Sequence, residues 1–312
     1  MGVKPEIIKQ PLVPQVERDI SLPLASIVIV NLNQGHYLND CILSVVNQSY
    51  KNLEIILQDG GSNDESLEIL KKYPQINLVS ETDFSSGHAF AKASSRASGD
   101  FLFFLNSSDG FYSKSWVEDA VTELQKSVNV SMVTGSVVGV DSDSTLNSYY
   151  WPKNKVNQKI SNFYSWLFDG FGFTPISFGV KTEVFKACSA PQDRFIDPKD
   201  PNSIDFFWYF SEKFFSKGYV SISIEKVAAF VRIHSDRVDD SAYLARQLAQ
   251  LNLFIKRFRR ELLFGYKKHR FIDSESREIN NEKFRIEELW KYYLMSKIRH
   301  LFFDKLQKKV TI

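Results

Sequence analysis

Cysteine is scarce in this chain: Cys41 and Cys188 are the two among 312 residues. So few cysteines exclude a disulfide scaffold and a cysteine-rich zinc site, and they are compatible with a reducing compartment. Long apolar runs are absent as well, since a run such as Ala25 to Val30 is far shorter than the ~18 residues that cross a bilayer. The first 20 residues contain three prolines and no apolar core of signal-peptide length. These absences predict a cytoplasmic protein without a membrane-spanning helix.

A strong excess of one charge sign is also missing, because 39 Lys and Arg residues face 37 Asp and Glu residues, a net charge of +2. A dedicated nucleic-acid binder should be strongly basic, so nucleic acid is not predicted as a partner. The total hides a split: residues 253–312 carry 16 Lys and Arg against 8 Asp and Glu, whereas the first 252 residues have a net charge of −6. Aromatic residues such as Phe254 and Trp290 are interleaved in the basic segment. That segment suits either an anionic membrane surface, or packing of its aromatics on the rest of the chain or in a homodimer.

Strand-like and helix-like segments alternate through the first 126 residues. Short apolar runs predict strands at 25–30, 53–57, 76–80 and 101–105. Helical spacing and helix-start residues predict helices at 36–48, 64–72, 86–97 and 114–126. This alternation predicts an α/β fold with a mostly parallel, doubly wound sheet flanked by helices. Ligands bind at the carboxyl ends of such strands, a rule that selects Asn31–Asn33, Gln58–Asp64 and Asn106–Gly110.

The second half has a weaker pattern. Strands are predicted at 130–140, 174–181, 219–224 and 227–233, and a helix at 203–216. From about Ser241 the pattern is helical to the end, with breaks near Gly265 and over 273–281. We therefore predict an extended lead-in over 1–24 and a basic, aromatic-rich helical C-terminal extension over 241–312.

Two aspartates follow predicted strands. Asp59 lies in a turn with two glycines, where it could accept hydrogen bonds from a base or ribose or could stabilise the turn itself. Asp109 follows the strand FLFFL within Asn-Ser-Ser-Asp-Gly. A carboxylate there can bind a divalent cation, which can neutralise a diphosphate, although a helix cap is the alternative.

His234 and Asp205 are weaker candidates on the residues alone. His234 follows the predicted strand AAFVRIH, and a single histidine is more often structural than a ligand. Asp205 begins an aromatic helix (DFFWYF), where the helix dipole alone favours an acidic residue.

Three segments resemble family 2 glycosyltransferases, which have the GT-A fold. They are SIVIVNLNQGHYLNDCILSVVNQSYKNLEIILQDGGSNDESLEIL, GDFLFFLNSSDGF and the SETD at 80–83. The resemblance is specific over about 25–125 and weaker over 170–240, and it does not cover 245–312. It implies a GT-A domain over 25–240, with a nucleotide-sugar half (25–125) and an acceptor half (126–240).

The resemblance also implies roles for individual residues. Asp109 and His234 would bind a divalent cation, Mn²⁺ or Mg²⁺, and Asp205 would be the catalytic base of an inverting displacement. The residues that would bind the nucleotide-sugar are Asn31, Asn33, Asp59, Gly60, Ser62, Lys92 and Ser108.

The sequence departs from the family pattern at several of these positions. Ser108 stands where the family usually has an aspartate, and Asn106 takes another position that is often acidic. His88 and Ala91 replace an aspartate and an asparagine, while Lys92 is retained. His88 could act as a polar contact in place of the aspartate or could lie on a helix face. Loss of a carboxylate from a cation site predicts weak metal binding.

The leading hypothesis is a transferase that moves a sugar from a UDP-sugar to a glycan or lipid-linked glycan. It would act in the synthesis of a bacterial capsule, O-antigen or exopolysaccharide, at the inner face of the cytoplasmic membrane. The alternative is an inactive relative that binds nucleotide-sugars as a scaffold. A dinucleotide oxidoreductase is disfavoured, because the turn NLNQGHY has one glycine and lacks the Gly-x-Gly-x-x-Gly pattern.

Overall fold

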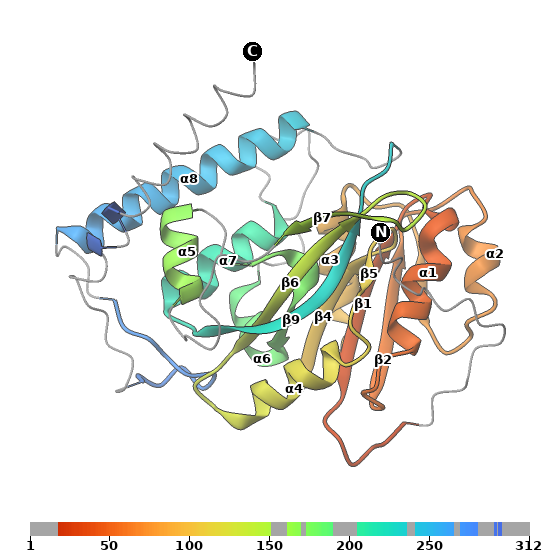
Figure 1. The fold of residues 1–312 in the computed structure, drawn as a ribbon, viewed down its shortest axis with the longest axis horizontal. Coiled ribbons are helices and arrows are strands. Elements are labelled where there is room, and N and C mark those ends of the chain that lie inside the picture. The colour runs from red at the N-terminus through yellow and green to blue at the C-terminus, as the bar shows by residue number, and fades with distance from the viewer. Residues whose placement is uncertain are drawn as a thin grey trace.

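The computed structural model describes most of the chain and places a twisted sheet at its centre (Figure 1). The described residues are 18–150, 161–169, 173–189, 205–235, 241–264, 269–279, 290–291 and 293–294. Most of the predicted lead-in over 1–24, and the greater part of 280–312, lie outside them.

The first four strands form the parallel half of the sheet. β1 (Ala25–Asn31) pairs in parallel with β2 (Leu53–Asp59) and with β4 (Phe101–Asn106). β2 pairs in parallel with β3 (Asn77–Ser80) on its other side. Apolar residues dominate β1 and β4 because helices cover both faces of the sheet.

The remaining strands extend this sheet without a break, so that one sheet runs through both halves of 25–240. Its order is β3-β2-β1-β4-β8-β6-β9-β5, with β7 paired to β6. β8 is antiparallel to β4 and β6, while β9 is parallel to β6 and antiparallel to β5. The bounds are β5 (Gly110–Phe111), β6 (Met132–Val140), β7 (Leu146–Tyr150), β8 (Phe178–Lys181) and β9 (Ser221–Arg232). The predicted mostly parallel α/β fold is confirmed.

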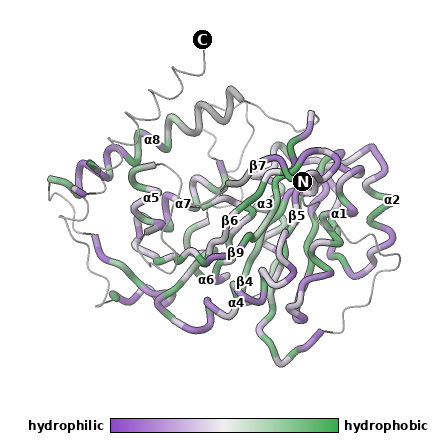
Figure 2. Tube along the Cα trace, in the orientation of Figure 1, coloured by the Kyte–Doolittle hydropathy of each residue, from purple (hydrophilic) through white to green (hydrophobic). Residues whose placement is uncertain are grey.

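In the central strands, alternate residues enter one of two large apolar clusters, one on each face of the sheet. Ile27 and Ile29 of β1 belong to one cluster, whereas Val28 and Val30 belong to the other. The first face is covered by α1 (Gly35–Val46), α2 (Ser66–Leu70) and α4 (Trp116–Lys126). The second is covered by α3 (Ser86–Ser95), α5 (Ser161–Asp169), α6 (Thr182–Cys188), α7 (Phe206–Lys217) and α8 (Ser241–Leu263). Figure 2 shows hydrophobic residues concentrated along the central strands.

Two features of the second half differ from the prediction. The strands expected at 219–224 and 227–233 are one strand, β9. The polar pair Glu225-Lys226 resembles a turn in sequence, but the register of β9 against β6 shifts there, and the Ser136 hydroxyl donates to the Lys226 carbonyl at 2.9 Å. Residues 269–272 are not helical as expected: Ile272 bridges to Tyr219 and to Glu278. The break expected over 273–281 is present as a turn at 274–276.

The described part of the basic segment is integrated into the fold. α8 is helical as expected, and its residues Leu251, Ile255, Phe258 and Leu262 are buried in the second cluster. Phe271 joins the same cluster. These side chains support the interpretation in which the segment packs its aromatics on the rest of the chain. Among the described helices, none has the length and apolar character of a bilayer span.

Candidate functional site

Asp59 is the centre of a hydrogen-bonded cluster at the carboxyl end of β2. Its carboxylate accepts hydrogen bonds from the Asn31 side-chain amide at 2.7 Å, the Ser62 backbone N–H at 2.9 Å and the Ser80 hydroxyl at 2.7 Å. Burial raises the pKa of Asp59, but these hydrogen bonds outweigh it and hold the pKa below the ordinary value. Asp59 is therefore an oriented carboxylate at neutral pH.

The loops after β1 and β2 are joined beside this cluster. The Asn33 N–H donates to the Ser62 hydroxyl at 2.8 Å, and the Asn33 side-chain oxygen accepts from the Asn63 N–H at 2.9 Å. Asn33 has a φ of 51°, in the left-handed region that asparagine tolerates. Gly60 leaves room for Asp83, since a Cβ on Gly60 would lie 2.7 Å from the Asp83 carboxylate. The structure thus brings together Asn31, Asn33, Asp59, Gly60 and Ser62, which the sequence selected separately.

Asp83 is a member of this edge that the sequence analysis did not select, although it is the last residue of the SETD segment. Burial raises its pKa to about 6, even though Lys92 acts in the opposite direction. Lys92 forms an ion pair at 2.9 Å with Glu81, which follows β3, and so lies close to the same edge of the sheet. Asp83 and Lys92 give this border of the site a pair of opposite charges.

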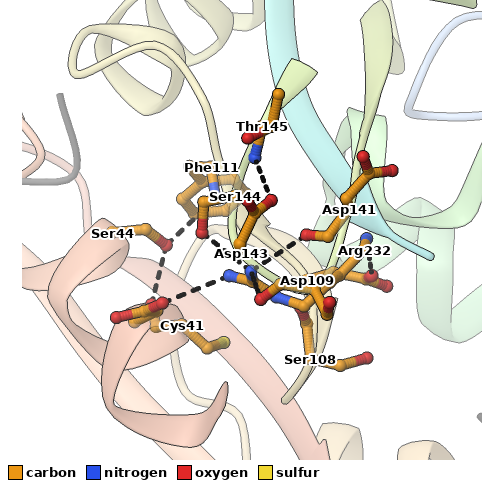
Figure 3. Close-up of polar contacts among 12 residues, drawn as sticks. Cys41, Ser44, Ser108, Asp109, Phe111, Asp141, Asp143, Ser144, Thr145 and Arg232 are labelled. Atoms are coloured by element: carbon orange, nitrogen blue, oxygen red, sulfur yellow. Dashed lines mark hydrogen bonds and ion pairs between the residues drawn. The ribbon is translucent and has the colours of Figure 1, made fainter. Parts of the chain in front are cut away.

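Asp109 lies on the other side of β1, directly after β4. One of its carboxylate oxygens accepts from the Arg232 backbone N–H at 3.0 Å, and Figure 3 shows both residues. The other oxygen accepts from the Asn106 side-chain amide at 2.9 Å. The side chain is almost fully buried. These two contacts fix the orientation of the Asp109 carboxylate and join the loop after β4 to the end of β9.

The Arg232 guanidinium connects the end of β9 to the loop after β4, to the turn with Ser144 and to α1. The sequence analysis did not select this residue. It is 1% exposed and donates to the Ser108 carbonyl at 3.1 Å and to the Ser144 hydroxyl at 2.8 Å. It also pairs with Asp40 of α1 at 3.2 Å and lies over the Tyr37 ring at 4.7 Å. The Arg-x-His at 232–234 was its one signal in the sequence.

The residues predicted to hold a cation form an incomplete set. Within the described residues, no three His, Cys, Asp or Glu side chains converge as a metal cluster. Position 108 supplies a buried serine instead of a second carboxylate. His234 is two residues beyond Arg232 and its ring packs against Tyr37 at 4.7 Å. This set supplies fewer protein ligands than a closed metal site has, so a cation bound here would take its remaining ligands from water or from a bound ligand.

Asp205 is the N-cap of α7, where its Oδ1 accepts from the backbone N–H groups of Phe207 and Trp208, both at 3.0 Å. Burial raises the pKa of its carboxyl, against the effect of these two hydrogen bonds. The start of α7 packs on the first turn of α3, because a Cβ on Gly87 would lie 3.2 Å from the Phe206 Cβ. Asp205 therefore lies near the first turn of α3.

Comparisons with known proteins agree with this fold. Residues 26–187, about half of the chain, match the profile of glycosyl transferase family 2. An uncharacterized glycosyltransferase of Haemophilus influenzae is 41% identical over 96 residues, which cover 29% of this chain and 38% of that protein. Chondroitin synthase of Escherichia coli is 30% identical over 137 residues, which cover 42% of this chain and 20% of that protein. The chain therefore spans less than half the length of these relatives.

A solved structure shows the same architecture. Staphylococcus aureus TarS 1–349, in complex with UDP-GlcNAc, superposes with a TM-score of 0.54 at 16% identity. The superposition covers 74% of this chain and 66% of that chain. At this identity the likeness concerns the fold, which is the GT-A fold. The match over residues 26–187 shows that this chain belongs to glycosyl transferase family 2.

Proposed function

We propose that this chain transfers a sugar from a UDP-sugar to a hydroxyl group of a glycan or lipid-linked glycan acceptor. One observation carries the proposal: the oriented carboxylates of Asp59 and Asp109 flank the end of β1, at the edge where parallel sheets bind ligands. The TarS structure with UDP-GlcNAc supports the choice of nucleotide. Relatives named chondroitin synthase and putative teichuronic acid biosynthesis glycosyltransferase TuaG support a role in a bacterial surface polysaccharide.

In this proposal the Asp59 cluster binds the nucleoside. Its carboxylate accepts a hydrogen bond from the uracil or the ribose, and Asn33, Gly60 and Ser62 shape the loops around it. The hydrogen bonds within the cluster pre-orient the Asp59 carboxylate, so that its side chain loses little conformational freedom when the donor binds. Lys92 contributes positive charge on the side of the diphosphate.

Asp109, with His234 and the Ser108 loop, faces the diphosphate. These residues would hold a divalent cation, Mn²⁺ or Mg²⁺, that stabilises the charge of the leaving nucleoside diphosphate. A single carboxylate gives such a cation low affinity without the donor, so the metal and the nucleotide bind together.

Asp205 is proposed as the base of an inverting displacement. Its carboxylate accepts the proton of the acceptor hydroxyl while that oxygen forms a bond to the anomeric carbon and the bond to the diphosphate breaks. A pKa raised by burial brings this carboxyl closer to the operating pH, which favours proton transfer.

Release of nucleoside diphosphate from a panel of sugar nucleotides, with oligosaccharide acceptors, tests the proposal. We expect turnover of a UDP-sugar by the wild type and a loss on the order of 10²-fold or more in Asp205→Asn. Asparagine caps helices as well as aspartate does, so this variant should keep its thermal midpoint. Full activity of Asp205→Asn would reject this residue as the base.

The alternative of a nucleotide-sugar-binding scaffold is favoured by Ser108 and by the two hydrogen bonds that already occupy the Asp109 oxygens. It has a different outcome in the same assay. Donor binding in a calorimeter without release of nucleoside diphosphate for any donor and acceptor would support the scaffold and overturn the transferase.

We also propose that the outer face of α8 lies on an anionic membrane. Leu253 on α8 and Phe264, the residue that follows α8, are 68% and 63% exposed, and Lys256, Arg257 and Arg260 are exposed between them. Cations flanked by exposed apolar side chains are typical of peripheral membrane helices. This contact would bring the chain to a lipid-linked acceptor at the inner face of the cytoplasmic membrane.

Replacement of all three cations by glutamine (Lys256→Gln, Arg257→Gln and Arg260→Gln) tests this surface. Each cation near an anionic membrane contributes about 1 kcal/mol, so the triple variant should bind phosphatidylserine vesicles on the order of 100-fold more weakly in sedimentation. The matched control replaces the exposed Lys51, Lys71 and Lys72 by glutamine and should bind like the wild type. Equal binding by all three proteins would contradict the membrane contact.

A further inference from the structure

Phe84 exposes its aromatic ring at the start of α3. The side chain is 64% exposed, although most phenylalanines of the described chain are buried. Its ring stacks on the His88 ring, with 5.1 Å between the centroids and 13° between the planes. The Phe84 N–H donates to His88 Nδ1 at 3.3 Å, and the His88 N–H donates to the Ser85 hydroxyl at 3.2 Å. The exposed ring therefore has a fixed orientation.

His88 supports this ring as a neutral aromatic group. Burial lowers the pKa of His88, and the nearby Lys92 lowers it further. A neutral imidazole has one acceptor nitrogen, which agrees with Nδ1 accepting from the Phe84 N–H. Of the two alternatives that the sequence left for His88, the structure supports a helix residue that packs on its neighbour one turn earlier.

The position of Phe84 places it between the two parts of the proposed reaction. On one side it follows Asp83, whose carboxylate lies against Gly60 and so borders the Asp59 cluster. On the other side Gly87 of the same turn contacts Phe206, the residue after Asp205. The turn that carries Phe84 is therefore next to the border of the Asp59 cluster and next to the start of α7, where Asp205 lies.

We infer that Phe84 and Asp83 form a subsite for a pyranose ring of the acceptor glycan. This inference rests on the proposed transferase function and names the chemistry of its acceptor side. The Phe84 ring offers a flat apolar face to the C–H groups of the sugar, and the Asp83 carboxylate offers oxygens to its hydroxyl groups. Small-ligand sites combine aromatic walls with a few polar groups in this way.

A sugar fits this surface better than a protein partner does. Protein interfaces bury about 800 Å² on each partner, far more than one exposed ring provides. Phe84 is followed by the half-buried or exposed polar residues Ser85 and Ser86 and not by further apolar side chains. A single exposed ring and the carboxylate of the residue before it suit a ligand of monosaccharide size.

Binding of the full chain, in the presence of UDP, to an array of bacterial and mammalian oligosaccharides tests the subsite. We expect the wild type to bind a set of glycans, Phe84→Ala to bind them about tenfold or more weakly, and Phe84→Trp to retain them. The matched control Ile20→Ala removes another exposed apolar side chain, far from α3 in sequence, and should bind like the wild type. The KM for UDP-GlcNAc, used as the donor probe, should be the same in all four proteins.

Three results would overturn the inference. They are unchanged glycan binding by Phe84→Ala, a wild type that binds UDP but no arrayed glycan, and a donor KM that rises in Phe84→Ala while glycan binding is kept. The last result would assign the ring to the donor sugar. Absence of UDP binding and of donor turnover in the wild type would instead reject the proposed function, and this outcome is separate from the three above.

Discussion

Asp109→Asn is expected to lower kcat/KM for sugar transfer on the order of 10³-fold. In the proposed reaction the substitution removes the negative charge at the diphosphate site, and charge stabilisation of a leaving group contributes several kcal/mol to such reactions. Asparagine can still accept the Arg232 backbone N–H through its oxygen, and Asn106 can turn its own amide to accept from the new NH₂ group. The local hydrogen bonds should therefore persist while the charge is lost.

The measurement for this variant is steady-state release of nucleoside diphosphate at saturating acceptor. Glu68→Gln, which removes an exposed carboxylate on α2, is the matched control and should keep wild-type activity. The thermal midpoint of Asp109→Asn should stay within a few degrees of the wild type. Retained kcat/KM in a folded Asp109→Asn protein would remove Asp109 from the reaction.

Arg232→Met is expected to destabilise the fold by about 3 kcal/mol. Removal of one partner of a buried ion pair typically costs 3–5 kcal/mol, and the lower value applies because Asp40 is about one third exposed. The substitution also leaves the carbonyl groups of Ser108 and Ser142 without their guanidinium donor. Methionine preserves most of the side-chain volume, so the loss reports the hydrogen bonds and the charge rather than a cavity.

Chemical denaturation in urea, with fluorescence as the readout, gives this value. Arg270→Met is the control, because Arg270 is 65% exposed and pairs with Glu278 at the surface. Its free energy of unfolding should change by less than about 0.5 kcal/mol. Equal stability of the two variants would show that Arg232 does not hold the loops around Asp109 together.

The parallel half of the fold could be predicted because its signals are local. Each of its strands is a short run of apolar residues, and the helix between two strands has its own periodicity. The second half was harder, because its elements depend on partners that are distant in sequence. β5 has two residues and exists through its pairing with Phe230 and Ala229 of β9. The sequence analysis did not predict β5, β7 or α5.

The same distinction applies to the site. Asp59 and Asp109 could be selected because each ends a strand and is surrounded by small polar residues. Arg232 could not, because its contacts with Ser108 and Asp40 join residues more than 120 positions apart. Asp83 was overlooked because its meaning comes from its contact with Gly60, which the sequence does not show.

The structure shows where the aromatic residues and the cations of the basic segment 253–312 lie. The aromatic residues of the basic segment face the core at Phe258 and Phe271, whereas the exposed face of α8 carries cations between Leu253 and Phe264. The buried aromatic residues and the exposed cations therefore lie on different sides of the segment. A deletion of 253–312 would remove the buried aromatic residues together with the exposed cations. The glutamine variant removes the cations alone and leaves the packing of the segment unchanged.

The central claim is that the edge formed by β1, β2 and β4 binds the nucleotide diphosphate of the donor. A crystal structure of the chain with UDP and Mn²⁺ tests it most directly. The account predicts the uridine within hydrogen-bond distance of Asp59 and the diphosphate beside Asp109. UDP bound elsewhere on the molecule, with the Asp59 cluster and Asp109 untouched, would contradict it.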